Sequence, residues 1–363
     1  MRASCLRAGS APVAFRMAFG HAAATRDRAE NVLVEVEDAE GRKGLGEGCP
    51  RSYVTGETVP GALAFLAAHR DSLLAIENLQ QLKDWIAANI AAIDANPSAF
   101  CAAELALIDL FARQAGQDLE TFLGITRRSD PVPVSAVYGA GNATAFRLQA
   151  MLFGLNGMRD SKLKIGGNPA RDSARARSLA RRGPVRLDAN NLWPDAEAAL
   201  PSLRALAPHA WAVEEPVKPR DWSALAQIAR DTGLAIILDE SLLTRSDLAS
   251  APQDIAIVPN LRVSKQGGLL RSLDLLAHIP GRVIVGAQVG ETSILARAGL
   301  ALAHAAGDRL AGFEGAYAPL LLSSDVATPS LGFGRQGQVR HDRFNGKPGS
   351  GLSLVHRFAA DLA

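Results

Sequence analysis

Four charged residues recur along the sequence at nearly equal intervals. They are Lys164, Asp188, Glu214 and Asp239, separated by 24, 26 and 25 residues, and each lies at or next to the end of a short apolar segment. This interval suits one strand and one helix of a parallel sheet. If the apolar segments are strands, the four polar side chains meet at the carboxyl ends of those strands, where barrel enzymes build their active sites.

The alternation of side chains along a strand predicts which of these residues point into a barrel. One face of each strand contacts the surrounding helices and the other points inward. In the segment KLKI at 162–165 the apolar pair suits the helix side, so Lys162 and Lys164 point inward. The same alternation turns the three acidic side chains inward.

Three inward carboxylates require a compensating cation, because a buried charge without a partner is costly. No His or Cys is adjacent to these acids, and carboxylate oxygens suit a hard ion. We therefore predict Mg²⁺, with Mn²⁺ as the alternative, at Asp188, Glu214 and Asp239. The competing interpretation is a buried salt-bridge network of these acids with Lys162, Lys164 and Arg186, without chemistry.

Short apolar segments alternate with amphipathic ones from Pro131 onward, which predicts an α/β fold with a parallel sheet. The predicted strands are Val134 to Tyr138, Lys162 to Ile165, Val185 to Asp188, Trp211 to Glu214, Ile236 to Asp239, Ile255 to Arg262, Val283 to Gly286 and Leu310 to Glu314. The predicted helices are Arg171 to Arg182, Ala196 to Leu206, Trp222 to Thr232, Leu269 to His278 and Ser293 to Ala306. Eight strands with intervening helices indicate a β/α barrel.

The first third of the chain mixes strands and helices and predicts a separate α+β domain. Its strands are expected at Val13 to Phe19, Asn31 to Glu37 and Lys43 to Gly48, and its helices at Leu79 to Ile93 and Ala99 to Gln114. A transit peptide is the weaker alternative for the arginine-containing start of the chain. The expected limits are 1–128 for this domain, 129–328 for the barrel, and 329–363 for a tail that packs on the first domain.

The composition of the chain argues against nucleic acid or a membrane as its binding partner. The chain has 363 residues, 48% of them hydrophobic and 21% charged, and a net charge of +2 that is too small to suggest nucleic acid or an anionic membrane. Charged residues, Gly or Pro interrupt every apolar run before it could span a bilayer, and the three cysteines form no CxxC motif. We expect a cytoplasmic protein, a homo-oligomer, that binds a small soluble substrate.

Several segments together resemble a known family. They are KLK (162–164), RLDANN (186–191), VEEP (213–216), LDES (238–241) and SKQGGLL (264–270), with further similarity over 103–124 and 290–307. In this order they resemble the barrel motifs of the enolase superfamily, in the muconate-lactonizing-enzyme-like branch of its mandelate racemase/muconate lactonizing enzyme family. The resemblance implies a modified TIM barrel, (β/α)7β, with an α+β N-terminal capping domain.

The resemblance also implies a role for each matching residue. Asp188, Glu214 and Asp239 would bind Mg²⁺, Lys164 would remove the α-proton of a small carboxylate substrate, and Lys162 would polarise the substrate carboxylate. The superfamily uses a lysine or histidine base with Mg²⁺ in this way. Such a proton is too weakly acidic for an amine unless nearby positive charge stabilises the enolate.

The sequence departs from the family at the sixth barrel strand. Two-base members place a second lysine five residues before the Gly-Gly pair, and here that residue is Arg262. Arginine is a poor general base because it hardly loses its proton, so we predict that Arg262 stabilises charge instead. There is no histidine in 283–290, which disfavours the mandelate racemase branch. There is no Asp-x-Asp in 312–319, which disfavours a dipeptide substrate.

Three hypotheses for function follow. The favoured one is a one-base lyase, dehydratase or cycloisomerase that forms an enolate. The first alternative is a racemase or epimerase in which another group replaces the missing lysine, and the second is a silent paralogue that only binds ligand.

Weaker candidates for substrate contacts lie in loops and at the last strand ends. Each is a weak candidate, because a polar residue in a surface loop is more often simply solvated. They are Asn190, Lys265, Gln288, Glu291, His21, Arg51 and Tyr53.

Overall fold

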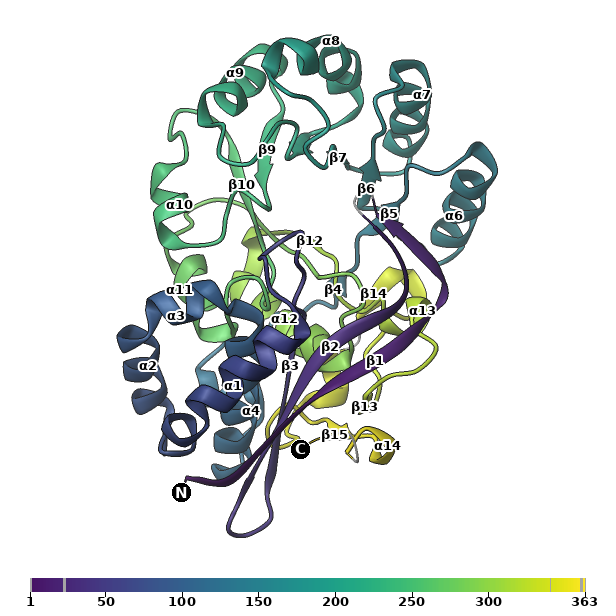
Figure 1. The fold of residues 1–363 in the computed structure, drawn as a ribbon. Helices are drawn as coiled ribbons and strands as arrows, with labels where there is room; N and C mark the ends of the chain where they lie inside the picture. Colours follow the sequence, from purple (N-terminus) through teal and green to yellow (C-terminus); the bar gives the residue numbers. More distant parts are fainter. Residues whose placement is uncertain (1, 22–23, 340, 360–361, 363) are drawn as a thin grey trace.

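A computed structural model describes residues 2–21, 24–339, 341–359 and 362, without the side chains of 17–26, 341 and 342. The chain forms a three-stranded antiparallel sheet with helices beside it, followed by a curved parallel sheet with helices on its outside (Figure 1). No helix in the described part of the chain combines the length and apolar character that a bilayer span requires.

The N-terminal sheet has the order β1-β2-β3. Its elements and the helices that follow are β1 (Ala3–His21), β2 (Ala24–Asp38), β3 (Lys43–Gly48), α1 (Val59–Leu74), α2 (Leu79–Ala88), α3 (Ile90–Ala95), α4 (Pro97–Gln114) and α5 (Leu119–Leu123). The start of the chain is therefore a strand, as the alternation of apolar residues predicted. Helix α4 is buried along most of its length between the sheet and the barrel helices.

The parallel sheet contains the eight predicted strands in sequence order. They are β5 (Ala136–Tyr138), β6 (Ser161–Lys164), β7 (Val185–Asp188), β8 (Ala212–Glu214), β9 (Ala235–Leu238), β10 (Ile257–Leu261), β11 (Val283–Val285) and β12 (Leu310–Phe313). The Ser135 amide donates to the Phe313 carbonyl at 2.8 Å and so links the two edges of the sheet. The predicted β/α barrel is confirmed.

Helices cover the outside of this sheet. They are α6 (Ala143–Leu155), α7 (Pro169–Ala180), α8 (Ala196–Leu206), α9 (Trp222–Thr232), α10 (Arg245–Ser250), α11 (Leu269–Ala277) and α12 (Ser293–Ala306). Aliphatic residues of the strands, such as Leu163, Leu187 and Val213, pack against these helices in the main core.

The last part of the chain packs against both the barrel and the N-terminal domain. Its elements are α13 (Ala318–Leu321), β13 (Ala327–Thr328), β14 (Gln338–Val339), β15 (Ser353–Leu354) and α14 (His356–Ala359), and β14 pairs with β4 (Val132–Pro133). The Leu119 amide donates to the Gly349 carbonyl at 2.9 Å, which joins this tail to α5. The limits expected for the three segments stay a prediction.

Some helix predictions were wrong. The expected single helix over 79–93 is two helices, because Asn89 leaves the helical conformation (φ −122°, ψ 23°) and its side chain donates to the Trp85 carbonyl. Helices α1, α6 and α10 were missed. Helix α6 exposes Leu148, Met151 and Leu155, so its sequence lacks the polar face that identifies an amphipathic helix.

Three glycines allow β3 to lie directly against α4. A Cβ atom on Gly44, Gly46 or Gly48 would overlap the carbonyl oxygen of Ala106, Ala102 or Ser98 respectively. The alternate residue of this strand, Glu47, points to the other side, toward the barrel helix α12. The glycines therefore fix the position of Glu47.

We predict that Gly46→Ala lowers the free energy of unfolding by at least about 3 kcal/mol, because the backbone of α4 must move to make room. Gly139→Ala is the control, since a Cβ there meets no atom within 4 Å, and it should change that free energy by less than about 1 kcal/mol. Urea denaturation measures both. Equal stability of the two variants would show that β3 and α4 do not pack this closely.

Candidate active site

The parallel register brings the predicted site residues to one end of the barrel. Lys164 lies beside Asp188 in the pairing of β6 with β7, and Asp188 lies beside Glu214 in the pairing of β7 with β8. Asp239 directly follows the last residue of β9. The spacing in the sequence thus becomes a row of side chains on adjacent strands.

Lys162 lies in the centre of this row. Its Nζ is 2.7 Å from Glu214 Oε2, 3.2 Å from Asp188 Oδ2 and 3.3 Å from Glu314 Oε1. Burial alone would lower the pKa of Lys162, but the three carboxylates raise it well above its ordinary value. These carboxylates therefore favour the protonated form of Lys162.

Lys164 lies nearer the opening of the barrel. Its side chain is 21% exposed, against 4% for Lys162. The Nζ atom is 3.1 Å from Asn190 Oδ1 and 3.7 Å from Asp188 Oδ2. Asn190 has a positive φ of 46°, which asparagine tolerates, and this turn lets its amide donate to Asp188 Oδ1 at 3.1 Å. Of the two lysines, Lys164 is the one that a substrate at the rim can reach.

Asp239 is held by two cations. Arg262 Nη2 pairs with Asp239 Oδ2, and Lys265 Nζ lies 2.8 Å from Asp239 Oδ1. Burial alone would raise the pKa of Asp239, but Arg262 and Lys265 hold it well below its ordinary value. Asp239 is therefore ionised.

Lys265 does not have the position expected of a substrate contact. It is fully buried, and its Nζ also donates to the carbonyl oxygens of Asp239 at 2.6 Å and Asn260 at 3.1 Å. Three acceptors thus use its three N–H groups. Lys265 supports Asp239, and its expected role is corrected accordingly.

Arg262 faces Lys164 across the barrel. β6 and β10 are four strands apart in the eight-stranded order, so the ends of these strands lie on opposite sides of the opening. Burial would lower the pKa of Arg262, but the nearby carboxylates of Asp239, Glu240 and Glu214 raise it further above its ordinary value. A guanidinium that keeps its proton thus lies on the side of the opening opposite Lys164.

Several buried groups at this end of the barrel were not predicted. Glu215 accepts from the amides of Asp239 and Ser241 at 2.7 and 2.8 Å, and Asn260 donates to Glu214 Oε1 at 3.0 Å. Burial raises the pKa of Glu215 to about 8. The second acid of VEEP and the serine of LDES were the available signals for this support of Asp239.

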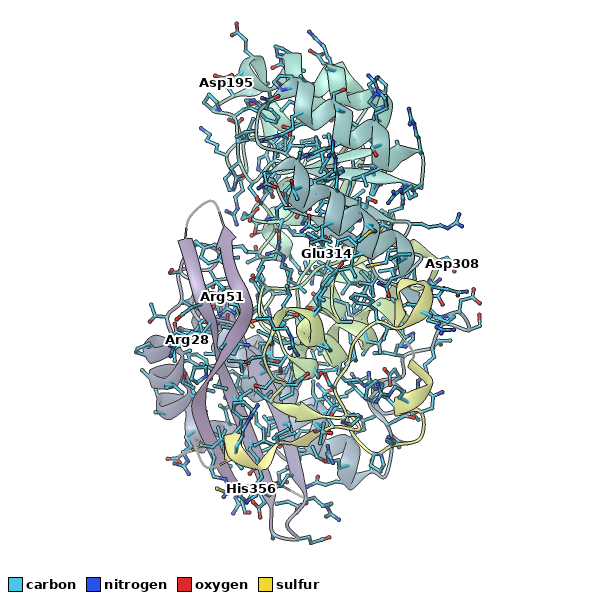
Figure 2. The ribbon with its side chains drawn as sticks, turned by 90° about the vertical axis from the view of Figure 1, so that its right-hand side faces the viewer. Arg28, Arg51, Asp195, Asp308, Glu314 and His356 are labelled. Carbon is cyan, nitrogen blue, oxygen red and sulfur yellow. The ribbon has the colours of Figure 1, made fainter. Side chains whose placement is uncertain are left out.

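Glu314 is a buried ion-pair partner and not a solvated acid at a strand end. Arg186 Nη2 lies 2.8 Å from Glu314 Oε1. Burial would raise the pKa of Glu314, but Lys162 and Arg186 lower it to about 2. Figure 2 labels Glu314 in the middle of the molecule and Arg51 beside the β1–β2 ribbon.

Arg51 is also corrected, because its terminal nitrogens are used within the protein. Nη1 donates to the carbonyls of Glu30 and Pro50, and Nη2 donates to Asn31 Oδ1 and the Val289 carbonyl. The side chain therefore joins the N-terminal sheet to the loop after β11.

The other weak candidates have different surroundings. Gln288 is buried. Its side-chain Oε1 accepts from Arg262 Nη1 at 3.3 Å, and its backbone amide donates to the carboxylate of Glu291. Burial raises the pKa of Glu291 to about 8. Tyr53 is exposed in the loop after β3, and the side chain of His21 lies outside the described residues. The roles of these residues stay predictions.

The predicted metal ligands, Asp188, Glu214 and Asp239, are carboxylates, and a hard divalent cation prefers such oxygen ligands. Burial, and the neighbouring Asp188 and Glu314, raise the pKa of Glu214 to about 8 against the opposing effect of Lys162. In residues 2–21, 24–339, 341–359 and 362, no three acidic, His or Cys side chains are gathered as a metal site, and Lys162 and Arg262 form ion pairs with Glu214 and Asp239. The metal ligands therefore stay a prediction.

Comparison with known proteins identifies the family. A model of the "Enolase C-terminal domain-like" family matches residues 147–356, and one of the "Mandelate racemase / muconate lactonizing enzyme, N-terminal domain" matches residues 8–124. The chain belongs to the mandelate racemase/muconate lactonizing enzyme family. The resemblance drawn from the motifs is confirmed, and the chain is an enzyme of the enolase superfamily.

Relatives within this family include epimerases and racemases. An L-Lys-D/L-Arg epimerase of Methylococcus capsulatus is 30% identical over 289 residues, which cover 76% of this chain and 79% of that protein. An N-succinyl-L-Arg/Lys racemase of Bacillus cereus is 26% identical over 343 residues, covering 89% and 88%. These names favour the racemase or epimerase alternative over the lyase or cycloisomerase that the sequence favoured.

Solved structures of the family have the same fold. A dipeptide epimerase from Methylococcus capsulatus, complexed with Mg and the dipeptide L-Arg-D-Lys, has a TM-score of 0.84 at 26% identity, covering 98% of this chain and 100% of that one. A muconate lactonizing enzyme from Pseudomonas fluorescens has a TM-score of 0.85 at 22% identity, covering 100% and 99%. The second likeness concerns the fold alone.

We predict that Asp188→Asn, Glu214→Gln and Asp239→Asn each weaken Mg²⁺ binding by at least on the order of 100-fold, since even supporting residues of metal sites contribute 10- to 100-fold. Glu314→Gln is the matched control, because Glu314 is buried beside Lys162 but is not a predicted ligand, and it should change the affinity far less. Isothermal titration calorimetry measures the affinities. Unchanged binding in all three variants would refute the ligand assignment.

Proposed function

We propose that this enzyme uses Mg²⁺, held by Asp188, Glu214 and Asp239, to invert the α-carbon of an amino-acid derivative through an enolate. The observation that carries the proposal is the pair of lysines on β6, one buried among carboxylates and one open to the rim. The names of the similar epimerases and racemases support it.

The two lysines would divide the work. Lys164 Nζ takes the α-proton, because it is the accessible amine at the rim. Lys162 stays protonated and offsets negative charge on the substrate carboxylate. Mg²⁺ bound by the three acids would supply Lewis-acid stabilisation of negative charge on the substrate carboxylate.

Inversion also requires a proton on the opposite side of the α-carbon. The residue on that side is Arg262, which holds its proton tightly, so the proton that completes inversion must come from a water molecule. Arg262 is therefore better suited to stabilise the enolate than to exchange protons. This one observation favours a second candidate function, a one-base elimination or cycloisomerisation on the side of Lys164.

An N-acylated amino acid is the substrate class that suits the site best. A free dipeptide carries an ammonium group that needs a carboxylate partner, and the acid available on β12, Glu314, is already paired with Lys162 and Arg186. An N-acyl group carries no such charge. The similarity to an N-succinyl amino acid racemase over most of the chain supports this class.

Lys164→Ala should reduce the rate of α-proton exchange by at least about 10²-fold, the lower range for loss of a general base. The measurement is NMR of N-succinyl amino acids with Mg²⁺ in D₂O. Lys218→Ala is the control, because Lys218 is an exposed lysine on the barrel surface, and its exchange rate should equal that of the parent. Exchange at the parent rate in Lys164→Ala would remove this lysine from the mechanism.

The two candidate functions differ in the stereochemistry of exchange. For a racemase, both enantiomers of an N-succinyl amino acid should gain deuterium at the α-carbon and interconvert in the parent enzyme. For a one-base enzyme, a single enantiomer should exchange and none should invert, whereas Arg262→Lys should introduce slow exchange of the other enantiomer. Chiral chromatography of the deuterated products distinguishes these results.

A further inference from the structure

The loops after β10 and β11 carry one side of the site and run directly into helices. The first loop holds Arg262 and Lys265 before α11 begins at Leu269, and the second holds Gln288 before α12 begins at Ser293. The start of each helix therefore sets the position of the loop before it.

Glu104 of helix α4 caps the start of α11. It is fully buried, and its two carboxylate oxygens accept the backbone amides of Leu269 and Leu270. These amides have no partner within their own helix, and a carboxylate is the preferred charge at this end. Gly268 has φ +117°, and a Cβ there would overlap the Glu104 carboxylate, so glycine is required for this approach.

Two further contacts join the same loop to the N-terminal domain. The Cys49 amide donates to Ser264 Oγ at 2.9 Å, and Arg271 pairs with Asp94 of α3. Contacts on both sides of Gly268 thus hold the loop from outside the barrel.

Glu47 of strand β3 has the equivalent role at α12. Its Oε1 accepts the Thr292 amide at 3.0 Å, and its Oε2 accepts Thr292 Oγ1 at 2.7 Å and the Leu295 amide at 3.0 Å. Asn31 donates to Glu47 at 2.6 Å and to the Gly290 carbonyl at 2.8 Å. Together with Arg51, these residues hold the loop that carries Gln288.

The opposite side of the site is arranged differently. Lys164, Asn190 and Asp188 hold one another through contacts between barrel residues. Burial raises the pKa of Glu104 to about 8 and of Glu47 to about 7, while the hydrogen bonds that they accept from backbone amides act in the opposite direction.

We propose that Glu104 and Glu47 are positioning residues of the active site, through which the N-terminal domain fixes Arg262 and Lys265 on one loop and Gln288 on the next. The link to catalysis rests on the proposed function, whereas the anchoring of the loops does not. Because Lys265 holds Asp239, the anchoring also reaches a proposed metal ligand.

The experiment compares Glu104→Gln, Glu47→Gln and a matched control, Glu57→Gln. Glutamine keeps one acceptor oxygen but places an N–H donor against the second backbone amide. Glu57 has the same chemistry inside the N-terminal domain, where it accepts the amides of Ser98 and Ala99 at 2.9 and 3.2 Å at the start of α4. All measurements use full-length protein at a temperature where circular dichroism shows every variant folded.

Hydrogen exchange by mass spectrometry reports on the loops themselves. Glu104→Gln should speed exchange in 262–272 and leave 286–296 unchanged, and Glu47→Gln should do the reverse. In the assay with N-succinyl amino acids, both variants should lower kcat on the order of tenfold, and Glu57→Gln should keep the parent kcat. Glu104→Gln should also weaken Mg²⁺ binding several-fold.

Two results would overturn the proposal. One is unchanged exchange of both loops in Glu104→Gln and Glu47→Gln, and the other is an equal loss of kcat in Glu57→Gln, which would mean a general effect on stability. If the parent enzyme acts on no N-succinyl amino acid, the proposed function fails, while loop exchange and Mg²⁺ affinity still decide whether these acids position the site.

Discussion

Mutual repulsion of buried carboxylates is the constraint around which this site is built. Asp188, Glu214 and Glu314 all lie within 3.3 Å of one ammonium group, that of Lys162, and Asp239 lies against Arg262 and Lys265. Such a group of acids is stable only when cations lie among them. A divalent ion bound among these acids would add two positive charges to those of the lysines and the arginine, which suits an anionic substrate.

The same constraint separates the properties of residues that look alike in sequence. Lys162 and Lys164 are two residues apart on one strand, yet the first is enclosed by acids and the second reaches the opening. Glu214 and Glu215 are adjacent, yet one faces Lys162 and the other accepts backbone amides beside Asp239. The role of each charged residue therefore depends on how far its side chain lies from the opening of the barrel and on the direction in which that side chain points.

The sequence predicts the features that follow from periodicity. The spacing of Lys164, Asp188, Glu214 and Asp239 located the four strand ends, because each strand and helix unit has a nearly constant length. The directions of loop side chains have no such period. Lys265 and Arg51 were therefore expected to meet substrate, whereas both are buried and hold parts of the protein together.

The close packing of β3 on α4 limits which chimeric proteins can be made by joining the N-terminal domain of one family member to the barrel of another. Glycines at 44, 46 and 48 bring the strand and the helix into backbone contact, and Glu47 and Glu104 extend from these two elements toward α12 and α11. The two anchors thus extend from two elements in direct contact, and this contact sets the distance between them. A chimera that joins this N-terminal domain to a foreign barrel inherits that distance, so it assembles correctly only where the two recipient helices start at matching positions.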